Sequence, residues 1–224
     1  RRGVSLQAEF RYLQPTDEGR VETHALPDDR AAGRSRYSLQ WAHQGALASG
    51  WRYGADWELA SDDAYWKDFS RLLPSQTPRL LAQDLRASRR WSNDATGAAI
   101  DVYARAQGWQ VLQGSEEAIA SPYQRMPQLG TRAIGPLTAG LRYSLEAEVN
   151  RFELRDTVPT DLRPNGTRAH LLGALERPTD VGWGWLTPRL ALNTAAYDTD
   201  RPMSDGRSSA RRTMPMPLAI ARRR

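Results

Sequence analysis

The stretch PLTAGLRYSLEAEV, residues 136–149, alternates apolar and polar side chains with a period of two. Because successive side chains on a strand point to opposite faces, this pattern predicts one long β-strand with an apolar face and a charged face. Such a strand exceeds the roughly five or six residues that are usual in soluble proteins. It suits a tilted strand that crosses a bilayer, which needs about nine to eleven residues. The apolar parity comprises Leu137, Ala139, Leu141, Tyr143, Leu145, Ala147 and Val149.

The same alternation recurs along the chain and predicts about eleven strands, which recur about every twenty residues. Short connections alternate with long ones, as in outer-membrane barrels, whereas soluble sandwiches usually repeat their strands about every eight to twelve residues. An odd number of strands does not close a bacterial barrel, and open edges in lipid would cost several kcal/mol for each unpaired backbone group. We therefore predict an all-β, antiparallel transmembrane β-barrel, of which residues 1–224 form only a part. The expected strands are residues 4–13, 20–26, 37–43, 51–59, 79–91, 98–112, 127–134, 136–149, 167–176, 181–197 and 213–220.

Composition excludes several classes of protein. The 224 residues include no cysteine, so a disulfide framework and a thiolate metal site are excluded. No apolar run approaches the roughly 18 residues of a membrane helix. The net charge of +5 invites a nucleic-acid partner, but Lys67 is the only lysine and the arginines alternate with Asp and Glu, so we expect no nucleic-acid binding. Because the chain opens on RRGV without Met, we expect an internal piece of a longer protein.

The two parities of the predicted strands assign residues to two faces. The apolar parity provides candidate lipid-facing residues: Leu137, Leu141, Leu145, Val149, Ile100 and Val102. The charged parity provides candidate lumen-facing residues: Arg142, Glu146, Glu148, Asp101, Arg105, Glu9 and Arg11. Trp41 and Trp51 flank one short turn, and amphipathic rings favour the bilayer interface, so this pair is a candidate aromatic girdle. Two core tryptophans of a soluble sheet are the alternative.

No arrangement of residues predicts catalysis, a metal site or a cofactor. None of the three histidines lies in an HExxH motif, and the chain has no cysteine to complete a zinc site. The glycine motifs of nucleotide sites and the GxSxG nucleophile motif are absent. Asp62, Asp63 and Asp68 lack the spacing of an EF-hand loop, which favours a solvated or locally hydrogen-bonded loop over a calcium site. We therefore expect no enzyme.

Several stretches, taken in chain order, resemble one family. They are RRG followed by AEFRYL at 8–13, LPDDR at 26–30, SDDAYWKDF at 61–69, MPQL at 126–129 and RAHLLGALERP at 168–178. Together they resemble the lipopolysaccharide-assembly (LptD) family, also called organic solvent tolerance proteins. The resemblance runs through almost the whole chain, and SDDAYWKDF is its most distinctive stretch.

The resemblance implies part of the translocon that assembles lipopolysaccharide into the outer leaflet of the Gram-negative outer membrane. The partners it implies are the plug lipoprotein LptE, the periplasmic lipopolysaccharide-transport bridge, lipopolysaccharide and membrane lipid. The family's N-terminal periplasmic domain, its remaining strands and its disulfide cysteines are not among these residues, so we expect barrel wall without the lateral opening. The alternative is a soluble all-β carbohydrate-binding module that uses its tryptophans.

Overall fold

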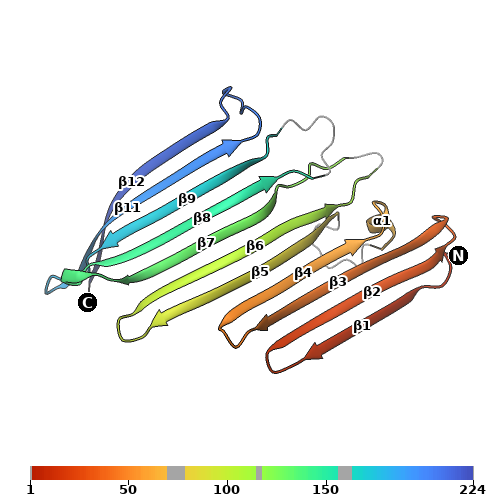
Figure 1. The fold of residues 1–224 in the computed structure, drawn as a ribbon, viewed down its shortest axis with the longest axis horizontal. Coiled ribbons are helices and arrows are strands. Elements are labelled where there is room, and N and C mark those ends of the chain that lie inside the picture. Colours follow the sequence, from red (N-terminus) through yellow and green to blue (C-terminus); the bar gives the residue numbers. More distant parts are fainter. Residues whose placement is uncertain (1, 70–78, 115–117, 156–162, 224) are drawn as a thin grey trace. The chain divides into compact units, whose positions relative to one another are not determined.

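An antiparallel sheet makes up most of the protein in a computed structural model that describes residues 2–69, 79–114, 118–155 and 163–223. Within these residues twelve strands are joined, and each long strand pairs with the next long strand in the chain (Figure 1). The all-β prediction is confirmed, and the two-residue β10 is the only described strand that it does not include. The strands are β1 (Leu6–Leu13), β2 (Asp17–Asp29), β3 (Arg34–Ala46), β4 (Trp51–Ala60), β5 (Leu80–Asn93), β6 (Ala98–Val111), β7 (Gln124–Pro136), β8 (Arg142–Glu153), β9 (Gly166–Glu176), β10 (Thr179–Asp180), β11 (Gly184–Thr199) and β12 (Ser209–Arg223).

Two compact units divide the chain, and the division runs through β5, β6 and β7. The first unit contains β1 to β4, which pair in succession. The second contains β8, β9, β11 and β12, which also pair in succession. Among the described residues, β1 pairs only with β2 and β12 only with β11. Such a sheet agrees with the prediction of an incomplete barrel.

Residues 137–141 form a turn, which corrects the predicted start of the long strand at residue 136. β8 begins after this turn and has 12 residues. Ala139 and Gly140 have positive φ angles of 57° and 73°, and the amide of Leu141 donates to the carbonyl of Thr138 at 3.3 Å. Two successive residues with positive φ are typical of a type I′ hairpin turn. The turn escaped prediction because its apolar residues continue the alternation of the strand. Two residues predicted to face lipid from a strand therefore flank a turn: Leu137 and Leu141.

Two other predicted boundaries are also wrong. The expected long loop at residues 27–36 is a short link, because β2 extends to Asp29 and β3 begins at Arg34. The last strand is 15 residues long and pairs with β11 along its length. Pro215 and Pro217 share one parity, so their missing N–H groups fall on one edge of β12 and leave the ladder to β11 unbroken.

Tyrosine rings lie over glycines on neighbouring strands. A Cβ atom at Gly19 would overlap the ring of Tyr12, and a Cβ atom at Gly130 would overlap the ring of Tyr103. An aromatic ring laid across a glycine restores side-chain cover to a strand that has none at that position. The same arrangement joins Tyr53 to Gly45 and Tyr143 to Gly135.

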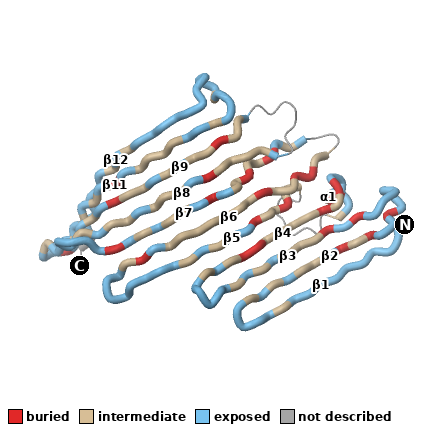
Figure 2. The backbone as a smooth tube through the Cα atoms, in the orientation of Figure 1, coloured by how far each residue is buried: buried red, intermediate tan, exposed pale blue. Residues whose placement is uncertain are grey.

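One short helix, α1 (Tyr65–Phe69), follows β4 and packs with the ends of the neighbouring strands. Tyr65, Leu81 and Leu112 are fully buried and form a small core with Ala60. Figure 2 shows buried residues gathered around this helix. Among the described residues, no helix is long and apolar enough to span a membrane.

Candidate functional site

The polar face of the second unit is organised around Glu148. Its carboxylate accepts hydrogen bonds from the Tyr103 hydroxyl at 2.7 Å, the Gln128 amide at 2.7 Å and the Asn150 amide at 2.5 Å. The donors come from β6, β7 and β8, and Asn150 is 1% exposed. We call these four residues the Glu148 cluster. Because one carboxylate joins three strands, the cluster stiffens the sheet on its polar side.

The other candidate lumen-facing residues form smaller pairs. Within the second unit, Glu146 accepts from Arg132 at 3.3 Å and Asp101 accepts from Arg90 at 3.0 Å. Within the first unit, Arg105 donates to Asp84 at 2.5 Å. Glu9 accepts from Arg11, and Arg142 is exposed at the start of β8. The structure therefore brings Glu146 and Glu148 onto one face of β8, and it distributes Asp101, Arg105, Glu9 and Arg11 over separate ion pairs.

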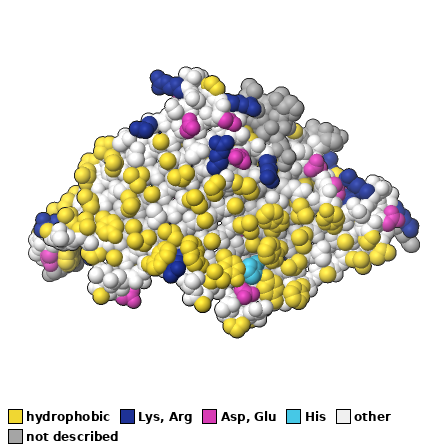
Figure 3. Space-filling view, in the orientation of Figure 1, with side chains coloured by type: hydrophobic (Ala, Val, Ile, Leu, Met, Phe, Trp, Pro, Cys, Tyr) yellow, Lys and Arg dark blue, Asp and Glu magenta, His cyan; other side chains and the backbone are white. Residues whose placement is uncertain are grey.

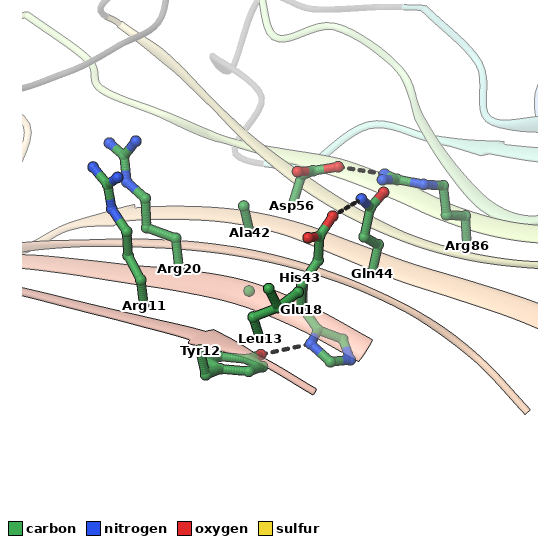
Figure 4. Close-up of a pocket in the computed structure, with 11 residues that line it drawn as sticks. Arg11, Tyr12, Leu13, Glu18, Arg20, Ala42, His43, Gln44, Asp56 and Arg86 are labelled. Atoms are coloured by element: carbon green, nitrogen blue, oxygen red, sulfur yellow. Dashed lines mark hydrogen bonds and ion pairs between the residues drawn. The ribbon is translucent and has the colours of Figure 1, made fainter. Parts of the chain in front are cut away.

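A hollow lies on the first unit, near the short connections of β1 to β4. Figure 4 shows Arg11 and Arg20 extending to one side, together with the Glu18–Gln44 and Asp56–Arg86 pairs. Tyr12 and His43 extend to the opposite side, where the Tyr12 hydroxyl lies 2.5 Å from Nδ1 of His43. The close-up thus separates a charged side of the strands from an aromatic side.

The side chains of the other parity, opposite the polar face, are largely apolar, and many large ones are exposed. In the second unit, the register aligns Tyr143 with Leu175 and Leu190, and aligns Ala147 with Leu171. Leu190 is 60% exposed, and the exposed side chains of this face extend over β6, β8, β9 and β11. Hydrophobic side chains cover much of the face seen in Figure 3. Among the predicted lipid-facing residues, those on strands with an exposed or half-exposed side chain are Ile100, Val102, Leu145 and Val149.

Aromatic rings gather on the apolar side of the first unit. His43 lies between Trp41, Tyr12 and Tyr53, with ring centroids 5.9, 5.8 and 5.4 Å away. Trp51 begins β4 and shares its parity with Tyr53. The candidate girdle of Trp41 and Trp51 therefore lies next to further rings that the sequence argument left out. The signal that could have found them is an aromatic residue close to a short turn, as at Tyr12 and Tyr53.

A buried ionic group lies at the other end of the first unit, which we call the Arg36 cluster: Arg2, Asp29, Arg36, Asp62 and Asp68. The guanidinium of Arg36 donates to both oxygens of Asp62 at 2.9 and 3.0 Å, and to Asp68 at 2.6 Å. It also donates to Asp29 at 3.3 Å, and its side chain is 1% exposed. Arg2 pairs with Asp29 and Asp68. Two arginines thus offset most of the charge of three carboxylates, and water is nearly excluded from Arg36, Asp29 and Asp62 but reaches Arg2 and Asp68.

The charges of this cluster set the pKa values of the carboxyl groups that follow β4. Hydrogen bonds from Arg36 lower the pKa of Asp68, against a smaller opposing effect of burial. Burial alone would raise the pKa of Asp62, but its bonds to Arg36 and Ser61 keep that pKa below its ordinary value. Both carboxyl groups are therefore ionised at neutral pH. The prediction of a solvated or locally hydrogen-bonded loop named no partner for Asp62 and Asp68, and the structure identifies Arg36 as a partner of both.

Within the described residues, no three His, Cys, Asp or Glu side chains converge on a possible metal position. The tyrosine, glutamine and asparagine of the Glu148 cluster were also missed. Tyr103 shares its parity with Asp101 and Arg105, but only the structure shows that Tyr103, Gln128 and Asn150 share one carboxylate.

Comparison with known proteins identifies relatives over nearly the whole chain. The family model LptD, described as LPS transport system D, matches residues 34–216. The LPS-assembly protein LptD of Polaromonas sp. is 36% identical over 96% of this chain, and that of Alkalilimnicola ehrlichii is 39% identical over 96%. The counterpart from Albidiferax ferrireducens is 34% identical over 96% of this chain. The chain spans 27% of the length of each of these relatives. It belongs to the LptD family.

Proposed function

We propose that this chain is barrel wall in the outer-membrane translocon that assembles lipopolysaccharide into the outer leaflet. The observation that carries the proposal is the two-faced sheet of an LptD family member. One face is tied together by hydrogen bonds and ion pairs, and the other exposes leucine, valine and isoleucine side chains. In a transmembrane barrel, residues alternate between lipid and lumen in this manner.

The apolar face supports contact with acyl chains. Each fully buried Leu or Val side chain gains about 1.5–3 kcal/mol relative to exposure to water, so Leu145 and Val149 would gain from a hydrocarbon environment. Ile100 and Val102 share this orientation on β6. Leu137 and Leu141 lie at the turn and would meet the rim of the membrane. The Trp41–His43–Tyr53 rings fit the interfacial girdle.

The polar face supports a hydrated lumen. Glu146, Glu148, Asp101 and Arg105 would present mixed charge to water, to a plug such as the lipoprotein LptE, or to the sugars of lipopolysaccharide. Arg142, Glu9 and Arg11 would lie on the same wall. Transport would then proceed by enclosure and guided sliding after delivery by the periplasmic lipopolysaccharide-transport bridge. No covalent step is required.

A soluble carbohydrate-binding module is the weaker alternative. Exposed apolar patches on soluble monomers seldom exceed a few hundred Å². The exposed leucines of β9 and β11 extend along two paired strands, which a soluble domain would have to cover. The lipid-facing interpretation explains this surface without a further partner.

The proposal is tested by site-specific photo-crosslinking in the full-length protein during lipopolysaccharide delivery to outer-membrane vesicles. A photoreactive residue replacing Glu146 should capture lipopolysaccharide or the plug lipoprotein. The same residue replacing Val149, three positions further along β8, should capture phospholipid. Capture of lipopolysaccharide at none of the polar-face positions would contradict the transport role, even if the outward positions capture phospholipid.

A further inference from the structure

We propose that Arg36 is a positioning residue that fixes residues 61–69 as a strap across the polar face of β2 and β3. If that face lines the lumen, as the proposed function has it, the strap narrows the passage at the end that carries the long connections. The narrowing of the lumen rests on the proposed function. The attachment of the strap stands on contacts within the first unit.

Charge attaches the strap to β3. Asp62 and Asp68 lie at two places in the strap, and Arg36 on β3 bonds to both. The planar guanidinium binds Asp62 through two parallel hydrogen bonds, which fixes orientation as well as distance. Without this cation, the carboxylates of Asp29, Asp62 and Asp68 would lie close together, and among the described residues only Arg2 and the exposed Arg34 would still pair with them.

Aromatic packing also attaches the strap to the sheet. The guanidinium carbon of Arg36 lies 5.4 Å from the centre of the Tyr65 ring and 5.0 Å from that of Phe69. Tyr65 is fully buried, and its hydroxyl donates to Ser38 at 3.0 Å and lies 2.5 Å from Nδ1 of His24. The strap therefore has a cationic attachment and an aromatic attachment, both on the same two strands.

The strap returns to the polar side of β2 and β3. His24 and Ser38 are register partners on β2 and β3, and both contact Tyr65. His24 shares its parity with Glu22 and Arg20, the charged parity of β2. The strap thus covers the polar face and leaves the apolar face free.

Amide hydrogen exchange in the full-length protein tests the attachment. The backbone amides of Ala64 and Tyr65 are hydrogen-bonded within the strap, to the Asp62 carboxylate and the Asp62 carbonyl. Arg36→Gln should accelerate exchange of residues 64–69 at least tenfold, and Arg36→Lys should give a smaller increase because it keeps the charge without the planar fork. The matched control is Arg20→Gln, which removes a half-exposed arginine paired with Glu9 and Glu22 on the same face. It should leave exchange in the strap unchanged.

Single-channel conductance of the same variants in planar bilayers tests the narrowing. Arg36→Gln should raise conductance above that of the wild type and of Arg20→Gln. If Arg36→Gln prevents assembly of the barrel, Asp68→Asn provides the milder variant, with the same direction expected in both measurements. Unchanged exchange in a folded variant would overturn the attachment, and faster exchange with unchanged conductance would overturn the narrowing. A wild-type protein that forms no pore at all would instead contradict the proposed barrel, while the exchange result would still decide the role of Arg36.

Discussion

The Arg36 cluster and the Glu148 cluster use the polar side of their strands in opposite ways. In the first, the buried cation Arg36 binds carboxylates from β2, from α1 and from Asp62 in the segment after β4. In the second, a carboxylate gathers neutral donors from β6, β7 and β8. The first joins a connection to the sheet, and the second joins strands to one another.

This difference teaches that charge on a barrel wall has separable tasks. A carboxylate that accepts hydrogen bonds across strands adds stiffness where the backbone ladder already holds the strands together. A charged pair between a strand and a connection determines where that connection lies, because no backbone ladder does so. Acidification should therefore affect mainly the Arg36 cluster, and loss of the Glu148 carboxylate should affect mainly the pairing of strands.

Acid should release the strap while leaving the strands paired. Asp62 and Asp68 have folded-state pKa values below their ordinary value of about 3.9, so their ion pairs stabilise the strap above about pH 4. That contribution is lost as the pH falls through the lowered values. Amide exchange of residues 64–69, corrected for the intrinsic effect of pH, should accelerate on acidification to pH 3. The turn at residues 47–50 has no carboxylate and is the internal control. Equal changes in both segments would contradict the ionic attachment.

Loss of the central acceptor should weaken the Glu148 cluster. Glu148→Ala leaves the donors of Tyr103, Gln128 and Asn150 without their acceptor, at a cost of about 1–3 kcal/mol in the free energy of unfolding. Urea unfolding of the full-length protein in phospholipid vesicles measures this cost. Glu146→Ala is the matched control, because an exposed ion pair contributes about 0–1 kcal/mol. Equal costs for the two variants would show that the cluster does not stiffen the sheet.

The smallest effect is expected at the turn between β7 and β8. Ala139 has a φ of 57°, a conformation that asparagine adopts more readily than alanine. Ala139→Asn should raise the unfolding free energy by less than about 1 kcal/mol, since a strained left-handed residue costs roughly 1–2 kcal/mol. Leu137→Asn, which lies outside the two central positions, should give no gain. A loss of stability in Ala139→Asn would contradict the turn geometry.

Alternation along the chain predicted the long strands and, outside the turn at residues 137–141, which side chains share a face, because a strand has a period of two whatever its neighbours are. It could not locate the turn at Ala139 and Gly140, whose residues obey the same parity. Nor could it find Arg36 as the partner of Asp62 and Asp68, because β3 and the segment after β4 meet only in the folded structure. Pro215 and Pro217 lie within β12, and their shared parity is compatible with an edge strand.

The central claim is that one face of these strands meets hydrocarbon and the other meets water. Leu171 and Leu172 are adjacent on β9, have the same chemistry, and point to opposite faces; the register places Leu172 beside Glu146. The decisive measurement is the free energy of folding into phospholipid vesicles for Leu171→Arg and Leu172→Arg in the full-length protein. Leu171→Arg should cost about 2–4 kcal/mol near the bilayer midplane, and Leu172→Arg should cost much less. Equal costs, or a larger cost for Leu172→Arg, would contradict the assignment of the two faces.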